Sequence, residues 1–204
     1  MPRLILISDT HDIFYPELPE GDILIHAGDV SLSGGIEETG RFFRWFRAQP
    51  HKYKICIGGN HDAALASLPV IFNKTGIDYL NDSFVDVDGL RIAGSPVSRK
   101  FGHICAFAKF GQELDRHWEN LDHSDILVTH GPPYGILDTC SPGEHNLGDE
   151  ALRVAVERIK PKVHVFGHIH GGYGIKELNG TTFVNAAILD ESYNGTHEPL
   201  VIEI

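Results

Sequence analysis

Residues of the kinds that bind metal ions follow short apolar runs at several points of the sequence. They are two aspartates, one asparagine and five histidines: Asp9, His11, Asp29, Asn60, His61, His130, His168 and His170. Neutral imidazole is the commonest protein ligand for metal ions near neutral pH. Each cluster alone is weak evidence, because a single His-x-His or Gly-Asp pair is more often a surface turn. The set as a whole favours a metal site.

The densest cluster is the pair His168 and His170, which stands between an apolar run and two glycines. The run Val163–Phe166 is rich in β-branched residues, as buried strands are, and Gly171-Gly172 predicts a turn. In an extended segment, side chains two residues apart lie on the same side. We therefore expect both imidazoles to reach one pocket.

The number and type of these donors predict more than one ion. A closed zinc site prefers cysteine and histidine, and Cys56, Cys105 and Cys140 lack the spacing of such a site. Mixed oxygen and imidazole donors suit manganese, iron or zinc better than calcium or magnesium. The expected cofactors are two divalent ions, with manganese favoured and iron, zinc or nickel as alternatives.

The apolar runs that precede the clusters predict buried strands at residues 4–7, 23–25, 53–57, 126–128 and 163–166. Amphipathic helices are expected at residues 36–49, 112–121 and 149–160. Strands that alternate with helices indicate an α/β fold with a largely parallel sheet. Sites in such sheets form outside the carboxyl ends of the strands, so the clusters are expected to converge in one crevice.

Other segments predict antiparallel strands and loops. Residues 84–94 alternate around an Asp-Gly turn, and Asn179-Gly180 joins two further predicted strands. A closing strand is expected at residues 200–204, and long surface loops at 95–109 and 132–148. The absence of repeats and linkers from the sequence predicts a single domain over residues 1–204.

The composition limits the classes of partner. A formal net charge of −11 argues against binding of a nucleic-acid polymer, which requires basic residues to neutralise phosphates. No apolar run is long enough to suggest a membrane span, and the N-terminal run is interpreted as a strand rather than a signal peptide. The odd number of cysteines, 3, argues against a disulfide framework and favours a cytoplasmic setting.

Five short motifs occur along the chain in a fixed order. They are Asp9-Thr10-His11, Gly28-Asp29, Gly59-Asn60-His61-Asp62, Thr129-His130-Gly131 and Gly167-His168-Ile169-His170. In this order the motifs resemble those of the calcineurin-like metallophosphoesterase superfamily. More narrowly, residues 129–138 and 163–174 are similar to the small phosphodiesterases of the metallophosphoesterase domain-containing group.

The resemblance implies a four-layer αββα sandwich of two mixed β-sheets flanked by helices. It implies that Asp9, His11 and His170 hold one metal ion and that Asp29 bridges both ions. Asn60, His130 and His168 would hold the second ion. His61 would face the substrate phosphate, and Asp62 is expected to orient an imidazole from behind.

These assignments predict hydrolysis of a small phosphodiester by a hydroxide that bridges two ions. A cyclic nucleotide is one candidate substrate. A phosphomonoesterase or nuclease on the same site is the first alternative. A catalytically silent interaction module of the same fold is the second.

Polar and aromatic residues outside the five motifs are given structural roles or left as weak candidates for substrate contact. His26 is expected to be a buried, hydrogen-bonded residue, and His103 and His164 to be structural or exposed. Phe14, Tyr134 and Tyr173 flank motif positions, where stacking on a base and local packing are both open, and Arg99 is a weakly placed phosphate contact.

Overall fold

The computed structural model describes residues 1–15, 17–68, 76–100, 105–141, 143–195 and 197–204. Its helices are α1 (Ile36–Ala48), α2 (Ala63–Ser67), α3 (Gln112–Glu119) and α4 (Glu150–Ile159). Its strands are β1 (Arg3–Ile7), β2 (Ile23–His26), β3 (Tyr53–Cys56), β4 (Asp78–Tyr79), β5 (Ser83–Val87), β6 (Leu90–Ser95), β7 (Ser98–Arg99), β8 (Ala108–Lys109), β9 (Ile126–Thr129), β10 (Val163–Phe166), β11 (Gly174–Leu178), β12 (Thr181–Asn185) and β13 (Leu200–Glu203).

Two large sheets form the body of the molecule. The first has the order β13-β1-β2-β3-β4, in which β1 to β4 are parallel and β13 is antiparallel. The second has the order β11-β12-β10-β9-β6-β5, with four parallel strands between two antiparallel edge strands. Both sheets are therefore mixed, as expected.

Alternation along the strands divides the core into layers, because successive side chains of a strand point to opposite faces. Leu4 and Leu6 of β1 pack in one cluster with Ile126 and Val128 of β9, which fills the space between the sheets. Ile5, on the other face of β1, packs in a second cluster with the aromatic residues of α1.

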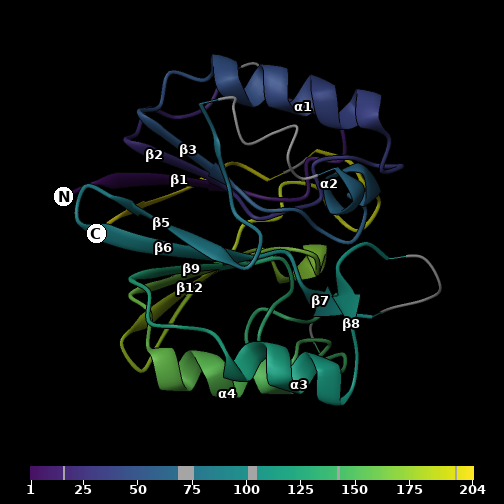
Figure 1. Ribbon diagram of the computed structural model, residues 1–204, viewed down its shortest axis with the longest axis vertical. Coiled ribbons are helices and arrows are strands. Elements are labelled where there is room, and N and C mark those ends of the chain that lie inside the picture. Colours follow the sequence, from purple (N-terminus) through teal and green to yellow (C-terminus); the bar gives the residue numbers. More distant parts are fainter. Residues whose placement is uncertain (16, 69–75, 101–104, 142, 196) are drawn as a thin grey trace.

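The second sheet is covered in the same way. Leu127 and Phe166 pack with Trp118 of α3 and Leu152 of α4. Figure 1 shows α1 on one side of the paired sheets and α3 and α4 on the other. The expected four-layer αββα sandwich is confirmed.

Helix α4 begins and ends at capping residues. In α4, the carboxylate of Asp149 accepts a hydrogen bond from the Leu152 N–H at 2.9 Å, and Lys160 ends the helix in the left-handed conformation. The same Asp149 carboxylate accepts from the indole N–H of Trp118 at 3.1 Å. One side chain therefore caps α4 and joins it to α3.

The two predicted hairpin turns have the expected conformation. Asp88-Gly89 and Asn179-Gly180 have positive φ values of 48°, 82°, 52° and 84°, as type I′ turns require. They join β5 to β6 and β11 to β12.

The prediction of a long surface loop at residues 95–109 missed two short strands. Ser98–Arg99 and Ala108–Lys109 pair as the short parallel strands β7 and β8, and Val97 is buried. The short elements α2 and β4 were also not predicted, because elements of two to five residues show no hydrophobic period. Residues 101–104, His103 included, lie outside the described residues.

Within the described residues, every helix is too short or too polar to traverse a lipid bilayer.

Candidate metal centre

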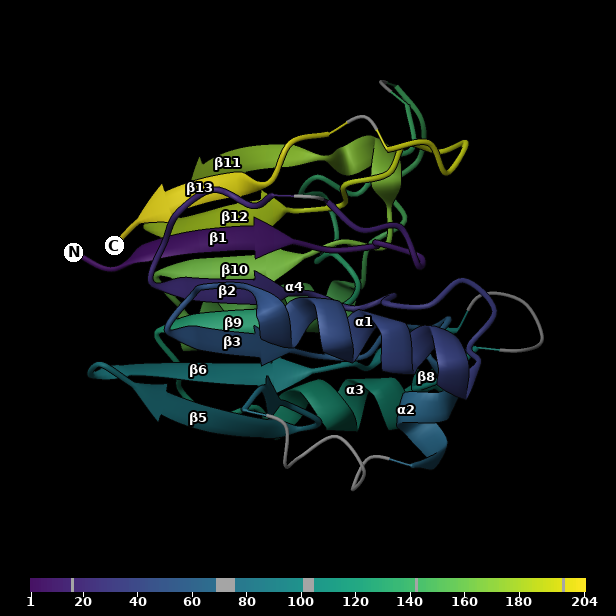
Figure 2. The same cartoon turned by 90° about the horizontal axis from the view of Figure 1, so that it is seen from above.

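The candidate ligands gather where the parallel strands of both sheets end. Asp9 follows β1, Asp29 follows β2 and Asn60 follows β3, while His130 follows β9 and His168 follows β10. Figure 2 shows the parallel strands of the two sheets running toward the same end of the molecule. Loops from both sheets therefore meet there, as the positions of the motifs predict.

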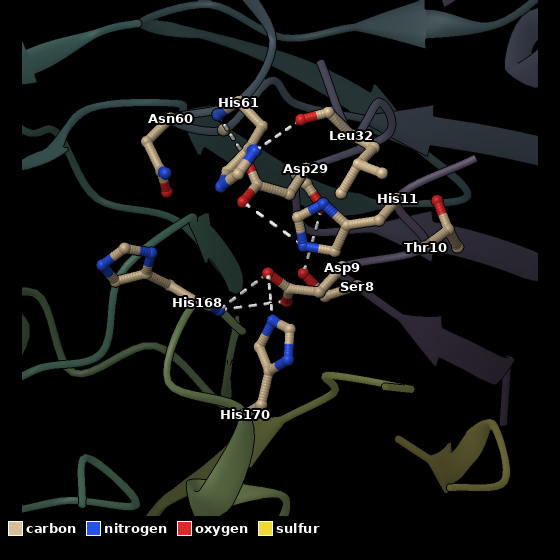
Figure 3. A network of polar contacts seen from close by, with 12 residues as sticks. Ser8, Asp9, Thr10, His11, Asp29, Leu32, Asn60, His61, His168 and His170 are labelled. Atoms are coloured by element: carbon tan, nitrogen blue, oxygen red, sulfur yellow. Dashed lines mark hydrogen bonds and ion pairs between the residues drawn. The ribbon is translucent and has the colours of Figure 1, made fainter. Parts of the chain in front are cut away.

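One group of potential ligand atoms comes from Asp9, His11 and His170, all of which are buried. The Asp9 carboxylate lies 3.4 Å from His170 Nε2. The backbone N–H of His168 donates to the same carboxylate, at 3.0 and 3.2 Å from its two oxygens. Figure 3 shows His170 approaching Asp9 in this way.

A second group comes from Asp29, His130 and His168. His130 Nε2 lies 3.4 Å from the Asp29 carboxylate and 2.8 Å from the amide oxygen of Asn60. His11 Nε2 lies 3.7 Å from the other oxygen of Asp29. Asp29 thus stands between the two groups, which is where a bridging carboxylate would have to be.

The imidazoles are oriented by backbone carbonyls behind them. The Nδ1 atoms of His11, His130 and His170 lie 3.2, 3.0 and 2.9 Å from the carbonyl oxygens of Ser31, Ala27 and Asp190. Donation by Nδ1–H leaves the Nε2 lone pair free to bind a metal ion. His11 Nε2 is buried and has no hydrogen-bond partner among the described residues. This donor set fits divalent ions.

The charges of the centre form two opposed pairs. Burial would raise the pKa of Asp29, but the charge and hydrogen bond of His130 lower it to about 2. Burial would lower the pKa of His130, but Asp29 raises it to about 9. Asp9 and His170 behave alike: against the effect of burial, the pKa of Asp9 is lowered and that of His170 is raised to about 9. Bound metal ions would take the place of these imidazole protons.

The backbone at the centre adopts an uncommon conformation. Asp9, His11, Asp29 and His168 have φ values of 55°, 43°, 55° and 68°, in the left-handed region that side chains disfavour. Hydrogen bonds between loops hold it: the Asp9 N–H donates to the Gly28 carbonyl at 2.9 Å, and the His11 N–H to the Asp29 carbonyl at 3.1 Å. Such strain is typical of functional sites.

His61 lies at the edge of the centre and is only partly buried. Its Nδ1 lies 2.7 Å from the Leu32 carbonyl, and its ring meets that of His11 edge-on, with centroids 4.8 Å apart. Figure 3 shows His61 and its contact with the Leu32 carbonyl on the side of the centre away from His170. His61 also falls in a potential ligand group with His11 and Asp29.

Asp62 is placed differently from the expectation that it orients an imidazole. Its carboxylate accepts from the backbone N–H groups of Val30, Ser31 and Gly59 at 3.1, 3.0 and 2.9 Å. The Ser31 hydroxyl donates to it at 2.6 Å. Burial and the charge of Asp29 raise the pKa of Asp62 to about 6. Asp62 therefore joins the loops after β2 and β3 that carry Asp29 and Asn60.

Most of the other candidates have local structural contacts. Phe14 stacks on Trp45 with centroids 5.2 Å apart, and Tyr173 stacks on His197 with centroids 4.0 Å apart. His26 is fully buried, with Nε2 3.0 Å from the Thr10 hydroxyl, as predicted. Tyr134 is 40% exposed.

Arg99 and His168 line the same small cavity. The predicted contact of Arg99 with a phosphate stays a prediction.

The sequence interpretation missed Tyr193. Its ring lies against two of the candidate ligands, with centroids 4.8 Å from His11 and 5.2 Å from His170. Burial and the charges of Asp29 and Asp9 raise the pKa of its hydroxyl. No apolar run or motif marks this residue.

Comparison with known proteins identifies the family. The calcineurin-like phosphoesterase profile matches residues 2–172. The chain is 36% identical to the human metallophosphoesterase domain-containing protein 1, over 99% of this chain and 71% of that protein. It is 34% identical to the UPF0046 protein C25E10.12 of Caenorhabditis elegans, over 99% of this chain and 80% of that protein.

A solved crystal structure superposes with a TM-score of 0.70 at 16% identity, covering 100% of this chain and 99% of the other, and supports the fold alone. The ordered motifs, the donor geometry and the family match agree. The chain belongs to the calcineurin-like phosphoesterase family, a family of metal-dependent phosphoester hydrolases.

Proposed function

We propose that this protein hydrolyses a small phosphodiester at a site that binds two divalent metal ions. The observation that carries the proposal is the position of Asp29, whose two oxygens face His130 at 3.4 Å and His11 at 3.7 Å in separate ligand groups. When bound, a pair of divalent ions stabilises the developing phosphoryl charge and activates water for attack. Manganese is the favoured metal because the donors mix oxygen and imidazole.

The ligand residues have distinct tasks in this proposal. Asp9, His11 and His170 would hold one ion, Asn60, His130 and His168 would hold the other, and Asp29 would be shared by both. Asn60 is neutral, so it adds an oxygen donor without adding negative charge where an anionic substrate must bind.

His61 is proposed to act on the substrate. Its Nδ1–H donates to the Leu32 carbonyl, which leaves Nε2 for a proton transfer to the leaving oxygen or a hydrogen bond to the phosphoryl group. Because the side chain is only partly buried, a substrate can reach it.

The net charge of the chain bears on the class of substrate. A chain with a net charge of −11 repels long polyanions, which favours a small diester, and a cyclic nucleotide is one candidate. A phosphomonoester remains the alternative for the same site.

The test compares metal dependence and substrate class in one experiment. Protein stripped of metal and reloaded with Mn²⁺ is assayed with bis-p-nitrophenyl phosphate and p-nitrophenyl phosphate. We expect faster diester turnover that requires Mn²⁺ and falls to background in Asp29→Ala. The control Asp86→Ala, which removes an exposed carboxylate paired with Arg91, should keep full activity.

A preference for the monoester would reassign the substrate class. Metal-loaded protein with no turnover of either compound would favour the interaction module instead.

A further inference from the structure

Tyr193 lies at the edge of the candidate metal centre. Its ring lies against both imidazoles of the ligand group formed with Asp9. The centroid of the Tyr193 ring is 4.8 Å from that of His11 and 5.2 Å from that of His170. The side chain is nevertheless 43% exposed, so one part packs on the centre and the rest faces solvent. Within the described part of the chain, no hydrogen bond is made by its hydroxyl.

The loop that carries Tyr193 is built onto the centre. The Asp190 carbonyl accepts from His170 Nδ1 at 2.9 Å, and the Glu191 carboxylate accepts from the Gly171 N–H at 2.6 Å. The Asp190 carboxylate accepts from the N–H groups of Ser192 and Asn194 at 2.8 and 3.0 Å. These bonds fix the loop to the turn that contains His170.

The backbone of Tyr193 is held in an unfavourable conformation. Its φ of 60° lies in the left-handed region, where Asn or Gly would cost less. Asn194 and Gly195 follow directly in the sequence, yet the tyrosine occupies the strained position. Strain of this kind persists where the surrounding structure imposes it, and it is concentrated at ligand-binding sites.

The two imidazoles that the Tyr193 ring contacts each lie beside a carboxylate: His11 is 3.7 Å from Asp29, and His170 is 3.4 Å from Asp9. An ordinary tyrosine is protonated near neutral pH and is a hydrogen-bond donor. A phosphoryl group bound between the ligand groups would therefore meet an available donor.

We propose that the Tyr193 hydroxyl donates a hydrogen bond to a phosphoryl oxygen of the bound substrate. This inference rests on the proposed function, since it assumes that a phosphoester binds at the centre. It makes Tyr193 a substrate-binding residue supplied by the loop after β12, in addition to the ligands in the strand-end motifs.

The test uses Tyr193→Phe, which keeps the ring against His11 and His170 and removes only the hydroxyl. In the Mn²⁺-loaded protein, kcat/KM for bis-p-nitrophenyl phosphate should fall about tenfold, equivalent to about 1.4 kcal/mol. The inhibition constant of inorganic phosphate should rise several-fold, with unchanged metal content. The control Tyr173→Phe removes a hydroxyl that donates to the Glu198 carbonyl and should match the wild type.

Other outcomes separate this inference from the proposed function. Equal kcat/KM and equal phosphate inhibition in Tyr193→Phe and wild type would overturn the proposed hydrogen bond. If Tyr193→Leu lost metal while Tyr193→Phe behaved like the wild type, only the ring would matter, and the proposed hydrogen bond would also be overturned. If the wild type turns over no phosphoester, the proposed function fails. Calorimetric titration of Mn²⁺-loaded protein with phosphate then decides: weaker binding by Tyr193→Phe supports the contact, and equal or no binding excludes it.

Discussion

The buried histidines of this chain differ in whether a backbone carbonyl lies next to the Nδ1 atom. Carbonyl oxygens lie behind His11, His130 and His170, so each Nε2 faces the centre. His164, in contrast, has Nε2 at 2.8 Å from the Thr129 hydroxyl and a buried Nδ1 with no partner among the described residues. The first arrangement suits a ligand, and the second is that of a neutral structural side chain.

His61 provides a test of the division between ligands and substrate contacts. In His61→Gln we expect turnover to fall by about 10²–10⁴-fold, the usual contribution of general acid–base catalysis, while metal content stays at the wild-type value. Activity and metal content are measured on the same sample. Full turnover in His61→Gln would remove His61 from the mechanism. Loss of metal together with loss of turnover would make His61 a ligand of the ion that His11 binds.

His164 should make the folded state sensitive to acid. Burial lowers its pKa from 6.5 to about 3, so the unfolded chain binds a proton that the folded chain does not. Its contribution is complete above about pH 6.5 and is lost as the pH falls toward 3. Between pH 7 and pH 5 this should lower the free energy of unfolding by about 2 kcal/mol.

Urea unfolding of the metal-free protein at both pH values checks this prediction. His164→Leu should lose less stability on acidification than the wild type by that amount. His123→Leu, which changes an exposed histidine, is the control and should follow the wild type. Identical pH dependence in His164→Leu and wild type would contradict the argument.

At the scale of elements, the centre depends on close approach between loops that follow different strands. A Cβ on Gly167 would overlap the Asp9 carboxylate and the Ser8 hydroxyl. A Cβ on Gly59 would overlap the Asp29 carboxylate in the same way. The motif positions Gly59 and Gly167 therefore have no room for a side chain, and this allows the carboxylates that follow β1 and β2 to lie against neighbouring loops.

Gly167→Ala should weaken metal binding by displacing Asp9. We expect an affinity loss of about 10–100-fold, similar to that seen when residues supporting metal ligands are changed. Gly40→Ala is the control, because a Cβ there meets only the Arg44 guanidinium at 3.6 Å. That helical substitution should stabilise the fold by about 0.5–1 kcal/mol without affecting metal binding. Unchanged Mn²⁺ affinity in Gly167→Ala would show that Asp9 is not a ligand.

Strands and ligands could be predicted where the sequence carries a local pattern. The apolar runs of β1, β2, β3, β9 and β10 are followed within a few residues by Asp, Asn or His, so sheet topology alone brings those residues together. The left-handed conformations at Asp9 and Asp29 could not be predicted, because hydrogen bonds between distant loops impose them. Tyr193 was missed for the same reason, since only the folded loop brings it to His11.

On the scale of the whole molecule, the centre joins the two sheets. Asp9, Asp29 and Asn60 come from loops of the first sheet, and His130 and His168 from loops of the second. Ions held by both sets would connect the two halves of the sandwich in the folded state only. Metal binding should therefore stabilise the fold, by about 2.7 kcal/mol at a free concentration 100 times the dissociation constant.

We expect phosphoester hydrolysis by this protein to require two ions in one centre. The most direct measurement is the titration of metal-free protein with Mn²⁺, following bound metal and turnover of bis-p-nitrophenyl phosphate in the same samples. Binding should end at about two ions per chain, as expected for a two-metal site, and turnover should appear mainly with the second. Saturation of binding, or full turnover, at one ion per chain would contradict it.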